Sequence, residues 1–558
     1  MAEAPAPASA QAAAGSPADM RWWGWGDPGR ADAVPRRAAA LLGATLDLPD
    51  GARPPVSLDE VALPASRLDS GRREALVAIV GEEGVRDDRD ARVLHAAGKG
   101  YPDLVRLRAG HPEGAPDAVV YPASHEQVQA VLAACAAGRI AVVPWGGGTS
   151  VVGGVAPLRG GLEAVVALDL RRLGRLLALD PVSHVATVEA GTRAPALEAQ
   201  LGAQGFTLGH FPQSFEFVSI GGCVATRSAG QASTGYGRID ELVLGLRAAT
   251  PAGEVRLPAF PATAAGPDLR ELMVGSEGAL GVLTEVSLRV RPRPAHRVYE
   301  GMFFRTFAAG VKALRAGAQR DALPDVARLS DEAETGVSLG LAGRGSLGAR
   351  LGRAYLSARG YGHGCLAILG WEGEPEDVAR RRGPGLALLR EHGGLSVGRS
   401  PGRQWERTRF EGPYLRDWLL DRGVLVETLE TAGLWSVLPE LHSGVGDALR
   451  QALGGRGTPA VVMCHVSHMY ETGASLYFTF LARQEAGSEI EQWQVAKAAA
   501  TEAILRGGGT LTHHHAVGRD HAPWLRAEIG PLGVATLRAV KAELDPAGIM
   551  NPGKLLLD

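Results

Sequence analysis

The chain has 558 residues, more than one hydrophobic core can hold, so we expect two or three domains. Its net charge of −3 and charged fraction of 21% exclude a general attraction to nucleic acid or to an anionic membrane. Four cysteines without a Cys-x-x-Cys pair argue against a disulfide framework or a zinc ribbon. Only five of the 58 basic residues are lysine, a bias typical of GC-rich bacterial genomes.

The two ends of the chain carry no recognisable targeting signal. Residues 1–20 are rich in Ala, Pro and Ser and predict a disordered tail, without the basic start and leucine-rich core of a secretory signal. No apolar run reaches the ~18 residues that span a bilayer. The C-terminal residues Leu555 to Asp558 differ from the Ser-Lys-Leu peroxisomal address. We therefore expect a cytoplasmic protein without signal peptide, transmembrane span or peroxisomal signal.

Residues 21–110 predict an N-terminal region of short helices broken by proline and glycine. It begins with three tryptophans within four positions, at 22, 23 and 25, which we interpret as a hydrophobic anchor rather than a ligand site. An α/β unit follows, with a strand at 117–121, a helix capped by Ser124 and a strand at 140–144. Further β-branched runs in the block 111–295 lie at 164–170, 185–188, 242–246 and 281–290.

Residues 296–525 form a second region, in which strand patterns alternate with long helical patterns. Strand patterns at 365–369, 461–466 and 475–481 are separated by helical patterns at 376–392 and 490–506. This arrangement predicts an α+β domain with an antiparallel sheet. A C-terminal segment, 526–558, contains a last helix and a glycine-proline turn, and we expect it to return to the first domain.

Small-residue turns in the block 111–295 are candidates for a nucleotide site. Gly146, Gly147 and Gly148 follow a strand, and their exposed N–H groups can form a nest for a phosphate. The loop lacks the Gly-Lys-Ser/Thr step of a Walker loop and the spacing of a GxGxxG motif. A plain tight turn explains it equally well in isolation, but two further turns, at 212–222 and 275–282, favour a long dinucleotide.

Three consecutive histidines, His513, His514 and His515, stand late in the chain. Imidazole is the side chain best able to move protons near neutral pH. If the segment is extended, His513 and His515 face one way and His514 the other, which disfavours one metal ion bound by all three. A metal site, a surface loop and a proton-transfer cluster are the three alternatives. We favour the last and predict no metal.

In this order, these motifs resemble those of flavoproteins of the vanillyl-alcohol oxidase type, and within that superfamily the alkyldihydroxyacetonephosphate synthases. The resemblance covers residues 90–558, with matching stretches at 146–150, 209–217, 226–227, 276–282, 414–417, 473–478 and 513–518. The histidine triplet separates the synthases from the related D-lactate, glycolate and D-2-hydroxyglutarate dehydrogenases, which usually carry Gly-Glu-His-Gly at this place.

The resemblance implies an α+β fold, with a two-subdomain FAD-binding domain at 111–295 and a cap or substrate domain whose antiparallel sheet is flanked by helices. It implies a noncovalent FAD, because Trp145 stands close to where relatives that tether the flavin place a His or Cys. The cofactor-binding residues that it implies are Pro144, Trp145, Gly146, Gly147, Gly148, Thr149, Ser150, Pro212, Gln213, Ser214, Phe215, Glu216, Phe217, Val218, Gly221, Gly222, Thr226, Arg227, Ser228, Ala229, Ser276, Glu277, Gly278, Ala279, Leu280, Gly281 and Val282.

The implied reaction exchanges the acyl chain of acyl-dihydroxyacetone phosphate for a fatty alcohol, through a flavin N5 adduct and without net redox change. Tyr477 aligns with the tyrosine regarded as a proton donor or acceptor, and Arg416 with a substrate-binding arginine. Without the resemblance, a core tyrosine and an ion-paired surface arginine would explain both residues. As a base, Tyr477 would need its pKa lowered from about 10. The three histidines complete the implied catalytic set.

The implied partners are these lipid-like substrates, a second copy of the chain in a homodimer and a transient membrane contact, with no nucleic acid. The alternative function is an FAD-linked oxidase or dehydrogenase of a D-2-hydroxy acid. A nonenzymatic binding subunit is disfavoured by Tyr477, Arg416 and the triplet. Two positions depart from the family pattern: Ala516 replaces the glycine that usually follows the third histidine, and Gln213 replaces an aspartate.

Overall fold

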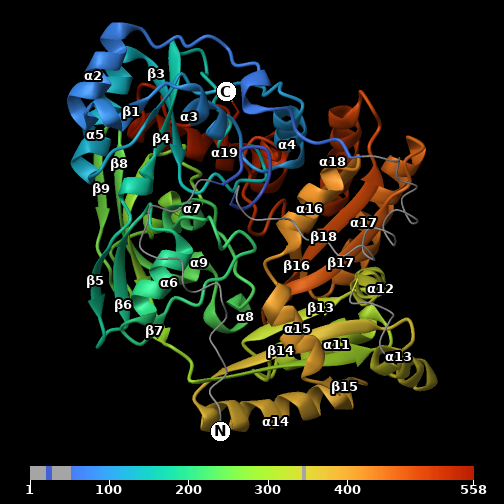
Figure 1. Cartoon of the computed structure of the whole chain (residues 1–558). Helices are drawn as coiled ribbons and strands as arrows, with labels where there is room; N and C mark the ends of the chain where they lie inside the picture. Colours follow the sequence, from blue (N-terminus) through green and yellow to red (C-terminus); the bar gives the residue numbers. More distant parts are fainter. Residues whose placement is uncertain (1–19, 28–51, 342–346, 558) are drawn as a thin grey trace.

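The structure, a computed structural model, describes residues 20–27, 52–341 and 347–557. Residues 1–19 of the predicted tail lie outside the described residues. Two bodies stand side by side in Figure 1: residues 70–292 form one, and residues 296–506 form the other. The C-terminal helix α19 (Leu525–Leu544), drawn in red, packs with the first body. The candidate site lies where the two bodies meet.

The first body contains the predicted α/β unit. Its four-stranded sheet has the order β1 (Val85–Arg86), β2 (Ala118–Val120), β4 (Ala164–Asp169), β3 (Ile140–Trp145), and β2, β4 and β3 are parallel. The connecting helix α5 (His125–Gly138) begins where Ser124 accepts a hydrogen bond from the Gln127 N–H. Near the C-terminus, Asn551 N–H donates to the Val142 carbonyl, so residues far apart in sequence meet at this sheet.

A five-stranded antiparallel sheet completes the first body. Its order is β5 (Leu176–Asp180), β6 (Val185–Glu189), β10 (Val282–Arg289), β8 (Val243–Thr250), β9 (Gly253–Leu257). The predicted β-branched runs therefore form strands. A two-stranded ladder of β7 (Phe206–Thr207) and β11 (Arg291–Pro292) leads to the second body.

The second body is built on one seven-stranded antiparallel sheet. Its order is β15 (Leu395–Gly398), β12 (His296–Phe304), β14 (Cys365–Gly373), β13 (Val326–Ser330), β17 (Val461–Met469), β18 (Gly473–Arg483), β16 (Val424–Leu434). All three strands that the sequence predicted here are present. The mixture of a parallel α/β unit with antiparallel sheets confirms the predicted α+β class.

Helices cover both bodies. Those of the first body are α2 (Ser70–Val80), α3 (Arg89–Leu94), α6 (Ala194–Gly202), α7 (Ile220–Ala225), α8 (Ser233–Tyr236), α9 (Ile239–Leu242) and α10 (Arg270–Met273). Those of the second body are α11 (Phe307–Ala318), α12 (Glu332–Leu341), α13 (Leu347–Ala358), α14 (Pro375–Glu391), α15 (Ser400–Thr408), α16 (Gly412–Leu420), α17 (Leu438–Gly455) and α18 (Glu489–Arg506). Helix α4 (Tyr101–Arg108) buries Tyr101 and Leu104 in the core of the second body.

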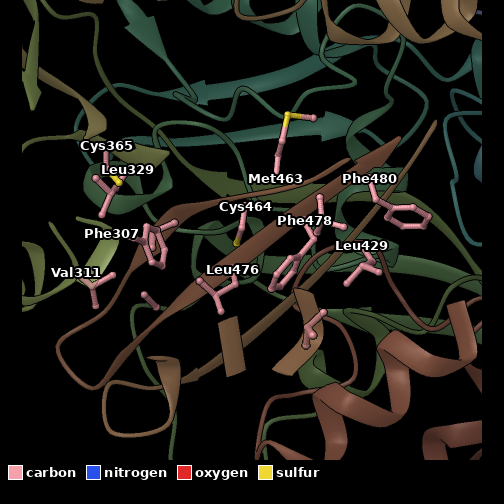
Figure 2. Packing of buried hydrophobic residues seen from close by; sticks show 14 of the residues in the cluster. Phe307, Val311, Leu329, Cys365, Leu429, Met463, Cys464, Leu476, Phe478 and Phe480 are labelled. Carbon is pink, nitrogen blue, oxygen red and sulfur yellow. The ribbon is translucent and has the colours of Figure 1, made fainter. Parts of the chain in front are cut away.

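Strand β18 shows how the large sheet is divided between core and site. Because strand side chains alternate, Leu476, Phe478 and Phe480 enter the core that Figure 2 shows, together with Phe307 from α11 and Leu329 from β13. The intervening residues Ser475, Tyr477 and Thr479 point to the other face. That face is turned toward the first body and carries the polar residues described next.

Candidate active site

The glycine loops that the sequence singled out meet in space. A side chain at Gly146 would overlap the Ser219 hydroxyl, one at Gly147 the Phe217 carbonyl, and one at Gly278 the Pro144 ring. Only glycine therefore permits the approach of the three loops at these positions. Gly148 and Gly278 also have positive φ values, of 66° and 74°. The loops 144–150, 212–222 and 275–282 form one glycine-lined cradle, as the close approach of a dinucleotide requires.

Several candidate residues in the cradle use their side chains within the protein. The Glu216 carboxylate accepts from Trp25 Nε1 at 3.0 Å and from the Tyr414 hydroxyl at 3.1 Å. Arg227 pairs with Asp240 and Glu271 on the outer side of the loop. Their side chains therefore shape the cradle's surroundings. Trp25, buried between the two bodies, agrees with the interpretation of the tryptophan motif as an anchor.

Three neighbouring strands place polar side chains in one row on the face of the large sheet that is turned toward the first body. Tyr477 of β18 lies directly opposite Glu430 of β16 and opposite His465 of β17. The rings of His465 and Tyr477 stack with centroids 4.9 Å apart. On the next strand, Arg328 donates to His465 Nδ1 at 3.1 Å. The register of the sheet thus brings together groups that are far apart in sequence.

The histidine loop, residues 510–518, lies over this row. The His514 ring is stacked with Tyr477 at a centroid distance of 5.8 Å, and the His515 ring meets Tyr477 edge-on at 5.4 Å. His513 Nε2 and the Tyr470 hydroxyl are 2.6 Å apart. The predicted catalytic residues, Tyr477 and all three histidines, are therefore brought into one cluster.

The alternation expected for an extended histidine segment does not occur. The segment is a curled loop, because the consecutive N–H groups of His513, His514 and His515 all donate to the Glu430 carboxylate, at 2.6, 3.0 and 2.9 Å. Such a curl gathers successive N–H groups on one side. As a result His513 Nδ1 and His514 Nδ1 lie 3.0 Å apart instead of facing opposite ways.

His468 brings a third imidazole to this pair. Ring nitrogens of His468, His513 and His514 lie within 4.8 Å of one another, the one three-residue set in the described part of the chain that is spaced for a metal ion. However, His468 Nε2 donates to the Gly230 carbonyl at 2.8 Å, and its Nδ1 bonds the Ser475 hydroxyl at 3.1 Å. Both nitrogens are thus engaged, and the absence of a metal stays a prediction.

Burial sets the protonation of the cluster. It lowers the pKa of His468 and of His514 to about 3, and that of His513 and His515 below the usual range. Burial also raises the pKa of Tyr477 to about 12, opposite to the shift that a tyrosine base needs. At neutral pH the imidazoles are therefore uncharged, and the tyrosine holds its proton.

Arg416, on α16, has donors that no other group among the described residues satisfies. Its Nη1 donates to the Lys99 carbonyl at 2.7 Å, but its buried Nε and Nη2 have no hydrogen-bond partner. Asp417 is 3.7 Å from Nη2, beyond hydrogen-bond distance. A buried guanidinium with unused N–H groups is costly unless a ligand satisfies them. Two donors in a fixed plane match the oxygens of a phosphate.

Sequence reasoning missed His465, His468, Tyr470 and Glu430. Alternation would place His465 and His468 on opposite faces of β17, but the register shifts between Val466 and Met469, so that both reach the site. Such a bulge has no clear signature in a single sequence. Glu430 did have a signal, because a carboxylate inside an apolar strand must find buried partners.

A cavity of about 770 Å³ opens beside the cluster, at the junction of the two bodies. Tyr470 forms part of its wall, and most of the other lining residues are charged or polar, among them Arg291, Asp325 and Glu372. This cavity therefore differs from the apolar tunnel that long alkyl chains require. Among its lining residues, Tyr470 contacts the histidine loop, with its hydroxyl 2.6 Å from His513 Nε2.

Comparisons with known proteins agree with this geometry. Residues 116–257 match the family model described as "FAD binding domain", and residues 293–555 match that described as "FAD linked oxidases, C-terminal domain". The cradle, with its glycine approaches and positive φ values, fits such a group, and FAD is the cofactor of this chain. The predicted fold, an FAD-binding domain of the vanillyl-alcohol oxidase type with a second domain, is confirmed.

The most informative relatives are synthases. The alkyldihydroxyacetonephosphate synthase of Dictyostelium discoideum is 34% identical over 85% of this chain and 78% of its own length. That of Trypanosoma brucei brucei is 32% identical over 87% and 80%. A solved alkyldihydroxyacetonephosphate synthase has a TM-score of 0.81 at 29% identity, over 96% of this chain and 99% of that one. By contrast, glycolate oxidase subunit GlcD of Bacillus subtilis is 24% identical, over 87% and 96%. The chain therefore belongs to the alkyldihydroxyacetonephosphate synthase family of FAD-dependent enzymes.

Proposed function

We propose that the chain exchanges the acyl chain of acyl-dihydroxyacetone phosphate for a fatty alcohol, with FAD as cofactor and without net redox change. The observation that carries the proposal is the placement of neutral imidazoles against a protonated Tyr477 beside the flavin cradle. When bound, the flavin supplies a ring nitrogen that can hold the substrate C1 carbon between departure of the acyl group and arrival of the alcohol.

The proton inventory of this exchange suits the cluster. One proton must leave C1, next to the ketone, and be returned, and the alcohol proton must pass to the departing carboxylate. His514 and His515 are the groups proposed to take up a proton, and they hold it only transiently because burial disfavours the imidazolium, while Tyr477 donates its own proton and recovers it. The rings of both histidines contact the Tyr477 ring, with centroids 5.8 and 5.4 Å away, so the groups proposed to handle these protons lie in one cluster.

Arg416 is proposed to bind the phosphate of the substrate. Its two unpartnered N–H groups are the buried donors that a phosphate would satisfy, and its third nitrogen is fixed by the Lys99 carbonyl. A guanidinium held on a helix orients the substrate as well as attracting it. This gives the reacting C1 carbon a fixed place relative to the histidine loop.

Noncovalent attachment of FAD remains part of the proposal. Cys223, the cysteine nearest the cradle in sequence, is fully buried, and burial raises the pKa of its thiol to about 12. A thiolate that could attack the flavin is therefore not available there. Acid precipitation should release the yellow colour into the supernatant, and colour retained in the pellet would disprove noncovalent binding.

The remaining proposals follow from the chemistry of the substrates. We propose a cytoplasmic homodimer that contacts membranes transiently to exchange long-chain lipids, to be measured by light scattering and by co-sedimentation with vesicles. No helix within the described residues is long and apolar enough to cross a membrane.

Exchange of a labelled fatty alcohol into palmitoyl-dihydroxyacetone phosphate tests the proposed reaction directly. The labelled ether should form while the absorbance of oxidised flavin is preserved at the end of turnover. Rapid anaerobic bleaching of the flavin by D-lactate or D-2-hydroxyglutarate, without any ether formation, would instead identify the chain as a 2-hydroxy-acid dehydrogenase.

A further inference from the structure

Three carboxylates, each from a different element, hold the histidine loop. Glu528 of α19 accepts from the Leu511 N–H at 2.5 Å and from the Thr510 hydroxyl at 2.7 Å. Glu277 of the flavin cradle accepts from the N–H groups of Val517 and Gly518, at 2.8 and 2.6 Å. Glu430 of β16 holds the histidines themselves. The backbone of the loop is thus fixed at its beginning, middle and end.

Glu430 differs from the other two in what surrounds it. It is 2% exposed and accepts four hydrogen bonds, from the three histidine N–H groups and from the Thr512 hydroxyl at 2.6 Å. Its oxygens also lie 3.7 Å from His514 Nδ1 and 4.0 Å from His515 Nδ1.

We propose that Glu430 is the positioning residue of the active site, which curls residues 512–515 around its carboxylate and fixes the imidazoles above Tyr477. The inference rests on the proposed function. Glu430 reaches its place because β16 pairs with β18 in a register that sets Glu430 opposite Tyr477. The same strand pair therefore places the proton-donating phenol and the anchor of the proton-accepting imidazoles.

The chemistry of the anchor requires a carboxylate. Four donors converge on two oxygens, and an ionised carboxylate is the side chain that only accepts hydrogen bonds. In Glu430→Gln, the amide NH2 group would face at least one backbone N–H, and the loop would have to open there. Burial of the charge is compensated by charge-assisted hydrogen bonds, which are stronger than neutral ones.

The test compares four variants of the FAD-loaded protein. Glu430→Gln removes the acceptor, Glu430→Asp keeps the charge on a shorter arm, and Thr512→Val removes one donor while keeping the charge. Glu528→Gln is the matched control, because it releases N–H and hydroxyl donors of the same loop that lie away from the imidazoles. FAD content, measured by absorbance, establishes that each variant is folded.

Two readouts separate positioning from general stability. We expect Glu430→Gln to lower kcat for alcohol exchange by about 100-fold with little change in KM, as misplacement of reacting groups does. The kcat of Glu430→Asp should be at least about tenfold higher than that of Glu430→Gln. Glu528→Gln should stay within about threefold of the parent protein. Hydrogen–deuterium exchange should accelerate in the peptide 512–515 of Glu430→Gln but not in that of Glu528→Gln.

The amide-exchange readout does not depend on the reaction. The parent protein could fail to catalyse alcohol exchange while hydrogen–deuterium exchange of the amides of 513–515 is still faster in Glu430→Gln. In that case the proposed function fails and the anchoring role stands. Glu430 is not the positioning residue if FAD-loaded Glu430→Gln keeps near-parental kcat. Equal losses of kcat in Glu430→Gln and Glu528→Gln would also overturn the inference. Should Glu430→Gln not fold, parental kcat and amide protection in Glu430→Asp and Thr512→Val would overturn it.

Discussion

Removal of the Arg416 guanidinium should weaken recognition of the substrate phosphate and little else. The two N–H groups without partners, on Nε and Nη2, can each form a charge-assisted hydrogen bond worth about 1.5–3 kcal/mol. Allowing for partial solvation of a side chain that is 17% exposed, Arg416→Ala should lose about 3–4 kcal/mol of transition-state binding. This corresponds to roughly 10²–10³-fold in kcat/KM. The kcat/KM of Arg416→Lys should lie between those of the parent protein and Arg416→Ala, because an ammonium keeps the charge but cannot reproduce the planar pair of donors.

The assay compares two substrates, acyl-dihydroxyacetone phosphate and its analogue without the phosphate. On the first, Arg416→Ala should show its full loss, mainly in KM. On the second, parent and variant should react at equal, low rates. Arg422→Ala is a suitable control, since this arginine lies over the Trp418 ring two residues beyond α16. Equal losses on both substrates would refute phosphate recognition and leave Arg416 with a structural role through its bond to Lys99.

Further predictions concern proton transfer and stability. His515→Ala should abolish turnover but retain FAD, because the triplet lies outside the glycine cradle; loss of flavin absorbance would show that the cluster is structural. Ala516 has a positive φ of 76°, so Ala516→Gly should raise the free energy of unfolding by about 0.5–1 kcal/mol in urea titrations, and a decrease would show that φ is not strained there. Burial lowers the pKa of His521 from 6.5 to about 3, so the folded state resists protonation that the unfolded chain accepts. Stability should therefore fall as pH drops from 6.5 toward 3, and His521→Gln should show a shallower loss of Tm over that window; an unchanged slope would contradict the neutral, buried imidazole.

The backbone conformation at Ala516 explains why the family usually has glycine at this position, which the sequence alone does not show. The sequence shows an alanine where glycine is usual, but not why glycine is usual. The structure supplies the reason, because the residue after the histidines must take a left-handed conformation while Val517 and Gly518 turn their N–H groups toward Glu277. Local sequence does not reveal such a conformation, since it is imposed by a carboxylate 240 residues away.

Local patterns predicted half of the eighteen strands and a few of the helices in the described part of the chain, because alternation and capping are properties of neighbouring residues. Ser124 marks the start of α5, and apolar residues at alternate positions mark β18. The glycine loops were also recognisable one by one. What the sequence could not show is their mutual approach, nor the sheet register that sets Glu430, Tyr477 and His465 side by side. Both are long-range properties, decided by packing between segments far apart in the chain.

The same long-range placement distinguishes this site from that of a 2-hydroxy-acid dehydrogenase. Relatives of that kind usually carry a glutamate within the loop itself, in the sequence Gly-Glu-His-Gly. Here the carboxylate comes from β16, and its oxygens are occupied by four donors of the loop, so it is not free to act as a base. In the proposed reaction, the imidazoles that burial keeps neutral take up the proton and Tyr477 donates one. A site that holds one proton on a phenol and offers neutral acceptors around it is suited to moving protons between two oxygens and a carbon, as an exchange of acyl for alkyl groups requires.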